Sequence, residues 1–98
     1  MLQFHWVSTT ITTNKQACEM VALYNRLHPE VGAFDTETNG LHIIACTPFL
    51  FQFGFLDIPN KTGYTFVVDI ERQPQLAHQV ITYWNKLAAA LKLYLGHH

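Results

Sequence analysis

Hydrophobic residues recur along the chain with two different periods. A period of two, in which every second residue is a phenylalanine, runs through Phe49, Phe51, Phe53 and Phe55 and predicts a central β-strand. Steps of three and four predict two amphipathic helices. The first contains Ala17, Met20, Val21, Tyr24 and Leu27, and the second contains Leu76, Val80, Trp84, Leu87 and Leu91.

Polar residues and prolines indicate where these helices begin and end. Thr13 and Gln16 have the spacing of a capping box, in which each side chain satisfies an otherwise unpaired backbone N–H of the first turn. Pro29 is expected to end the first helix. Pro74 suits the first position of the second helix, where its missing N–H costs nothing.

Four further apolar segments are predicted to be strands, at residues 4–7, 31–36, 64–70 and 93–96. Residues 39–47 are expected to form a loop and residues 58–63 a hairpin connection. This order predicts a single α/β domain, residues 1–98, with a mixed sheet. Three antiparallel strands would be followed by a right-handed crossover helix and a parallel strand.

The composition limits the classes of function that are open to the chain. Of 98 residues, 49% are hydrophobic and 13% are charged, which excludes a disordered or coiled-coil protein. The six Lys and Arg residues are scattered, so no basic face for duplex nucleic acid is expected. No apolar run is long enough to cross a membrane and the N-terminus lacks a signal-peptide pattern, so the expected location is the cytoplasm.

Two acids, Asp35 and Glu37, lie at the end of the predicted strand at 31–36. At positions i and i+2 of a strand, their carboxylates project from the same face. Such a pair suits Mg²⁺ or Mn²⁺, and a two-metal site activates a water and stabilises the leaving oxygen of a phosphodiester. The alternative is that the strand ends there and both acids are solvated, which is the interpretation adopted for the similar pair Asp69 and Glu71.

The segment FDTETNGL, residues 34–41, resembles the first motif of the DEDD 3′→5′ proofreading exonucleases, and in particular that of family A DNA polymerases from bacteria and phages. The likeness extends to the helical segment ITTNKQACEMVALYNRL and to the strands QFGF and TFVVDI, so it covers nearly the whole chain. It implies a ribonuclease H-like fold that hydrolyses single-stranded DNA from its 3′ end, with two Mg²⁺ or Mn²⁺ ions as cofactors.

The resemblance also implies roles for individual residues. Asp35 would bind both metal ions, and Glu37 would bind one of them while positioning the terminal nucleotide. Thr38 would contact the 3′ end through its backbone. Leu41 would pack against the terminal bases, since an apolar contact accepts any base.

The second motif of this family, Gly-His-Asn with a later Asp, is represented at the C-terminus by YLGHH. Gly96 and His97 match it, His98 does not, and neither the later Asp nor the third motif is present. The expectation is therefore the N-terminal part of an exonuclease domain, with two of the four acids and no activity by itself. An alternative origin of His97 and His98 is the start of a purification tag.

Two other functions stay open from the residues alone. One is a non-catalytic interaction module with a ribonuclease H-like sheet, whose last strand pairs with another chain. The other is a magnesium-dependent phosphotransferase, although the chain has no phosphate-binding loop. An Asp about four or five residues beyond His97 in the reading frame would favour the nuclease, and a stop codon would favour the module.

Self-association is also expected. In the family, further helices cover one face of the sheet, and without them the edge at 93–95 and part of the face formed by the phenylalanines of 49–55 would be exposed. A homodimer related by a two-fold axis would bury both surfaces at once.

Overall fold

The computed structural model of the chain describes residues 3–38 and 48–97. It confirms the α/β class, with two helices and a mixed five-stranded sheet. In chain order the elements are β1 (His5–Thr10), α1 (Asn14–Leu27), β2 (Val31–Thr38), β3 (Pro48–Asp57), β4 (Thr62–Asp69), α2 (Pro74–Ala88) and β5 (Leu93–His97). Neither helix in the described ranges has the length and apolar character needed to span a membrane.

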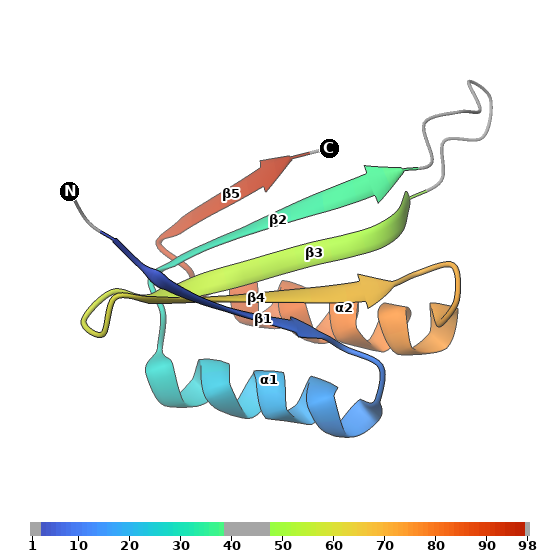
Figure 1. Cartoon of the computed structure of the whole chain (residues 1–98), viewed down its shortest axis with the longest axis horizontal. Helices are drawn as coiled ribbons and strands as arrows, with labels where there is room; N and C mark the ends of the chain where they lie inside the picture. The colour runs from blue at the N-terminus through green and yellow to red at the C-terminus, as the bar shows by residue number, and fades with distance from the viewer. Residues whose placement is uncertain (1–2, 39–47, 98) are drawn as a thin grey trace.

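The strands lie side by side in the order β1-β4-β3-β2-β5 (Figure 1). Strand β3 pairs antiparallel with β2 on one side and with β4 on the other. The two outer strands join by parallel pairs, β1 beside β4 and β5 beside β2. Strand β1 is longer than the segment predicted at 4–7, and it extends the sheet at the edge opposite β5.

Both helices lie on the same side of the sheet, so the molecule has two layers (Figure 1). The core lies between these layers, where alternate residues of β3 and β4 meet the apolar sides of α1 and α2. Its buried side chains are Ile11, Ala17, Met20, Tyr24, Phe51, Phe53, Phe55, Phe66, Val68, Ala77, Val80, Trp84 and Ala88.

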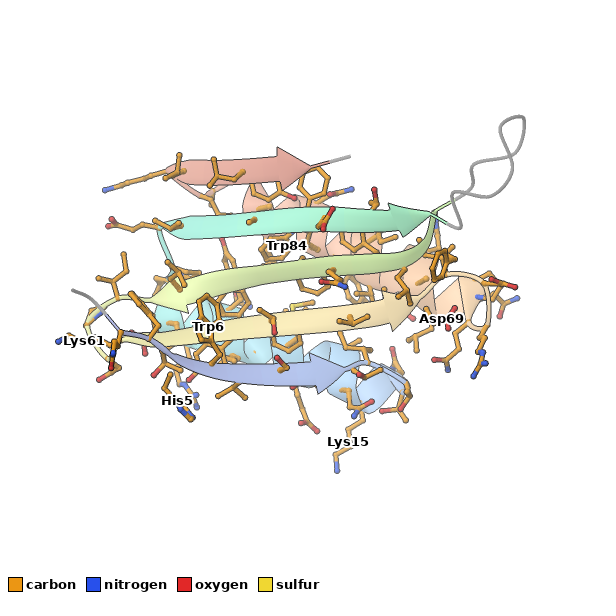
Figure 2. The ribbon with its side chains drawn as sticks, turned by 45° about the horizontal axis from the view of Figure 1, so that its top comes forward. His5, Trp6, Lys15, Lys61, Asp69 and Trp84 are labelled. Carbon is orange, nitrogen blue, oxygen red and sulfur yellow. The ribbon has the colours of Figure 1, made fainter. Side chains whose placement is uncertain are left out.

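The other side of the sheet is called the open face, because neither α1 nor α2 covers it. Figure 2 looks onto this face, with the helices behind the sheet. Its positions are Trp6, Ser8 and Thr10 of β1; Gly63, Thr65, Val67 and Asp69 of β4; Leu50, Gln52, Gly54 and Leu56 of β3; Val31, Ala33, Asp35 and Glu37 of β2; and Leu93, Leu95 and His97 of β5.

The expectation that part of the phenylalanine face would be exposed is wrong. Phe51, Phe53 and Phe55 are only 6%, 3% and 2% exposed, because they face the helices. A period of two predicts a strand with two different faces but does not state which face the helices will cover. Aromatic rings bury more apolar area than leucine, glutamine or glycine, so the ring-bearing face of β3 packs inward.

The predicted start signals of both helices are confirmed, but α2 ends at Ala88, so the prediction that Leu91 belongs to this helix is wrong. The capping box of Thr13 and Gln16 is confirmed, since the Thr13 hydroxyl accepts from the Gln16 N–H and the Gln16 side chain accepts from the Thr13 N–H. Helix α1 ends at Leu27, and His28 comes next in the left-handed conformation at φ 49°. Pro74 is the first residue of α2, as predicted.

Trp84 of α2 joins the helical layer to the sheet. Its ring stacks on Phe53 of β3 with centroids 4.6 Å apart, and its side chain is 0% exposed. The indole Nε1–H donates a hydrogen bond of 2.8 Å to the hydroxyl of Tyr94 on β5. Because a buried N–H without an acceptor is costly, this bond ties the edge strand β5 to the core.

Tyr94→Phe tests that link. It removes the acceptor of the Trp84 indole and leaves a buried donor unsatisfied, so we expect the free energy of unfolding to fall by about 1–2 kcal/mol. Chemical denaturation followed by circular dichroism measures the change. Tyr83→Phe is the matched control, because the Tyr83 hydroxyl accepts from Gln79 at a half-exposed place where water can replace it. An equal loss in both variants would contradict the role of Tyr94.

The same hydroxyl groups give the fold a pH dependence. Burial raises the pKa of Tyr94 above its ordinary value, although its hydrogen bond from Trp84 acts in the opposite direction, and burial also raises the pKa of Tyr24. A raised folded-state pKa stabilises the fold below the unfolded pKa of about 10, and this contribution is lost as the pH rises through the folded pKa. We expect unfolding free energy to decline above pH ~10, and less steeply in the Tyr24→Phe, Tyr94→Phe double variant.

Candidate functional site

Asp35 lies on β2, an internal strand between β3 and β5. Its neighbour Phe34 points to the helical side, where its ring stacks on Phe51 with centroids 5.9 Å apart and contacts Tyr94 at 5.3 Å. Because successive side chains of a strand alternate, Asp35 is on the open face, where it is half-buried. The prediction that the 31–36 segment is a strand carrying this acid is confirmed.

The backbone places the two acids as predicted. Asp35 pairs with Gln52 and Glu37 with Leu50 in unbroken register, so positions 35 and 37 share one face of β2. The register shifts between Glu37 and Thr38, an irregularity of the kind that ends regular pairing at sheet margins. The side chains of Glu37 and Thr38, and all of Leu41, lie outside the described residues, so their predicted contacts stay predictions.

Strand β5 ends directly beside Asp35. The parallel register pairs Phe34 with Gly96 and Asp35 with His97, so the carboxyl ends of β2 and β5 meet at the same edge of the sheet. A Cβ at position 96 would collide with the Phe34 ring, so this position needs a glycine for the two strands to lie together. Any residues that continue the chain after β5 therefore start next to the acid pair.

Sequence reasoning did not select Gln52 as a site residue. It is the cross-strand neighbour of Asp35 on β3 and is half-buried on the open face. The signal was available, because Gln52 is the one polar side chain in the otherwise apolar run FLFQFGFL at 49–56. A lone amide in such a strand indicates a polar neighbour on the adjacent strand, and here that neighbour is Asp35.

The open face changes in polarity from one end to the other. At the end of β2 nearest Val31, the paired row across the sheet is entirely apolar or glycine: Trp6, Gly63, Leu56, Val31 and Leu93. The row that contains Asp35 instead holds Thr10, Val67, Gln52 and His97. None of the open-face positions defined above is Lys or Arg, so the charged end of this face is acidic.

Among the described side chains, Asp35 and Asp69 are the acids of the open face. No group of three His, Cys, Asp or Glu side chains close enough to hold an ion occurs among residues 3–38 and 48–97. Asp35 has carboxylate oxygens of the kind that suit Mg²⁺ or Mn²⁺, and the ligand role of Glu37 stays a prediction because its side chain lies outside the described residues. Asp69, at the end of β4, has a different role: its carboxylate accepts from the Arg72 N–H at 2.9 Å and lies 3.9 Å from the Arg72 guanidinium.

Comparisons of the chain with protein-family models, with curated proteins and with solved structures gave no match.

Titration with Mn²⁺ tests whether the acid pair binds a cation. We expect weak binding, with a dissociation constant on the order of millimolar, because two carboxylates provide few ligands. In a ¹H–¹⁵N spectrum the amides of Phe34, Asp35 and Gln52 should broaden first, and Asp35→Asn should abolish this selectivity.

Asp69→Asn is the control for that titration, because it removes a carboxylate of the same face that is already paired with Arg72. The broadening around Asp35 should survive in this variant. Equal broadening in the unmodified chain and in Asp35→Asn would show that the ion binds elsewhere.

Proposed function

We propose that the chain is the N-terminal part of a metal-dependent 3′→5′ exonuclease domain of the kind found in family A DNA polymerases. Its substrate would be the 3′ end of single-stranded DNA, and its fold would belong to the ribonuclease H-like class. The proposal rests on the FDTETNGL segment and on where the sheet places it. Two features of the sheet support it.

The first feature of the sheet that supports the proposal is the connectivity of its strands. Strands β2, β3 and β4 succeed one another as antiparallel neighbours, α2 then crosses the sheet, and β5 runs parallel to β2. This is the order that the resemblance implies for the first half of a ribonuclease H-like sheet. Strand β1 and helix α1 precede it, in agreement with the likeness of the ITTNKQACEMVALYNRL segment.

The observation that carries the proposal is the pairing of Asp35 with His97. The first motif lies at the carboxyl end of β2, and the Gly96-His97 pair that resembles the second motif lies at the carboxyl end of β5. Parallel neighbours bring these ends together, so acids supplied after β5 would face Asp35. A metal site assembled from two strand ends needs this juxtaposition.

Within the proposed site, Asp35 and Glu37 would hold the divalent ions, and Thr38 and Leu41 would contact the terminal nucleotide. Bound Mg²⁺ or Mn²⁺ would supply water activation and stabilisation of the leaving oxygen. Asp35 is half-buried and is the cross-strand neighbour of Gln52 on the open face.

The charge of the open face agrees with a metal-dependent reaction. A phosphodiester approaching Asp35 would meet an acidic strand end and no Lys or Arg at any of the open-face positions. Repulsion between the phosphate and the carboxylates would oppose binding unless divalent cations stand between them. We therefore expect DNA contact at this end to depend strictly on the metal.

A second candidate is a non-catalytic interaction module. It is favoured by the position of β5 at the edge of the described sheet, with Leu93 and Leu95 exposed by 50% and 58%. Such an edge can pair with another chain. The two candidates differ in the residues they require beyond His98: the nuclease needs an Asp within about five positions, and the module does not. Sequencing the reading frame beyond His98 distinguishes them.

Nuclease assays of two forms of the chain test the proposal. The 98-residue chain should not degrade a 5′-labelled single-stranded oligonucleotide with Mg²⁺ or Mn²⁺, because two carboxylates do not close a two-metal site. The chain extended through its reading frame should shorten the oligonucleotide from its 3′ end, and Asp35→Ala should lower that rate by at least about 100-fold.

Asp69→Ala in the extended chain is the control and should leave the rate within about two-fold, because Asp69 pairs with Arg72. An extended chain with all four acids and no metal-dependent activity would refute the proposed function. Activity of the short chain that Asp35→Ala abolishes would refute its expected inactivity.

A further inference from the structure

A groove runs between the edge strand β1 and helix α1. It encloses a volume of about 540 Å³, which is within the range that ligand sites occupy, roughly 300–1,000 Å³. Apolar side chains from β1, β4 and α1 form its floor: Val7, Tyr64, Phe66, Met20 and Leu23. The groove lies at the opposite edge of the sheet from β5 and the acid pair.

Strand β1 presents an open row of backbone groups beside this groove. The N–H groups of His5 and Ile11 donate to carbonyls on the β4 side. A strand in a parallel pair directs alternate residues toward its neighbour, so the N–H and C=O groups of Trp6, Ser8 and Thr10 point away from β4, where the described sheet has no further strand. Residues 5–10 contain no Lys, Pro or bulge, which are the usual devices that keep an edge strand from pairing.

Two charges of opposite sign stand along the rim of the groove. Glu19 and Arg26 are exposed residues of α1 that line it, and neither forms an ion pair or a side-chain hydrogen bond within the described ranges. They are two helical turns apart, about 10.5 Å, on one side of α1. Helix α1 runs in the direction opposite to β1 (Figure 1), so Glu19 is nearer the end of β1 and Arg26 is nearer its start.

We infer that this groove binds an extended peptide, which adds to β1 as an antiparallel strand. Over the groove the peptide carries a basic, an apolar and an acidic side chain at alternate positions, in that order from its N-terminus. Main-chain hydrogen bonds to an edge strand give such a peptide its affinity, and pockets for alternate side chains give it its specificity. The inference is independent of the proposed function, because β1, β4 and α1 supply the whole site.

The open backbone groups fix the register of the added strand. Peptide residues opposite the even-numbered residues of β1 exchange hydrogen bonds with them, and the alternate residues place their side chains over the groove, beside Val7 and Thr9. An apolar side chain opposite Val7 covers a residue that is 38% exposed. The next alternate residues are about 7 Å to either side, so a long basic side chain on the Thr9 side reaches Glu19 and an acidic one on the other side reaches Arg26.

The charges select both the occupant and its direction. Antiparallel pairing is slightly more stable per residue than parallel pairing, and it puts the first half of the peptide beside Glu19, which is why the basic residue precedes the acidic one. Strand β1 of a second copy is a poorer occupant, because its alternate residues on this side are His5, Val7 and Thr9, with no acid to meet Arg26. Charge complementarity therefore favours a peptide that carries both signs.

Two synthetic peptides of the same composition test the inference on the 98-residue chain. The first is acetyl-Thr-Lys-Thr-Leu-Thr-Glu-Thr-amide, and the second has its Lys and Glu exchanged. In ¹H–¹⁵N titrations the first should bind and move the amide protons of Trp6, Ser8 and Thr10 downfield. The second should bind about five- to ten-fold more weakly, because two exposed ion pairs become two repulsions. Equal affinity for the two peptides, or no binding of the first at millimolar concentration, overturns the inference.

The double variant Glu19→Arg, Arg26→Glu provides the matching change in the protein, and both positions are exposed, so the fold should tolerate it. It should reverse the preference, so that the second peptide binds more tightly by the same factor. Lys86→Glu, which changes an exposed charge on α2 outside the groove, is the control and should leave the preference unchanged. An unchanged order of affinities in the double variant overturns the inference. Shifts of the same three amides that follow protein concentration and not peptide would make a second copy the occupant and overturn it too.

Discussion

The contact between Trp84 and the sheet determines the arrangement of the other elements. One indole on α2 stacks on Phe53 of β3, lies edge-on to Tyr24 of α1 and donates to the Tyr94 hydroxyl of β5. It therefore links both helices to the same side of the sheet and fixes the crossover strand beside β2. A small domain has few such side chains, because it buries a modest fraction of its surface. Trp84 and the phenylalanines of β3 occupy one side, and among the open-face positions the only aromatic side chain is the exposed Trp6.

Much of this arrangement is predictable from local sequence, and the reasons for the exceptions are physical. The capping box at Thr13 and the proline at 74 act within one helical turn, so their signals are complete in the sequence. Strand β1 is different, because its position beside β4 depends on a parallel pairing between residues nearly sixty positions apart. The prediction of which face of β3 is exposed is also wrong. The face that becomes covered depends on the side chains that the helices present and not on the period of the strand.

The candidate site also combines local features, which the sequence predicts, with non-local features, which it does not. The i, i+2 spacing of Asp35 and Glu37 is a local property of a strand, and the backbone register agrees with it. The neighbours of Asp35 are not local: Gln52 comes from an antiparallel strand and position 97 from a parallel one. The pattern of acidic residues identifies Asp35 and Glu37 but not Gln52, because glutamine carries no charge. The apolar run that surrounds Gln52 was the better indicator.

The polarity of the open face changes along its strands, so its two ends favour different surroundings. Near Val31 the rows are apolar and best removed from water, whereas near Asp35 they are polar and best kept in contact with it. Apolar burial is approximately proportional to area, so it favours covering the first half whatever occupies the second. A cover limited to the half between Trp6 and Leu95 would leave the Asp35 end accessible to ions and to a nucleic acid end. Strands only eight to ten residues long at β2, β3 and β4 therefore carry both an apolar and a polar end on one face.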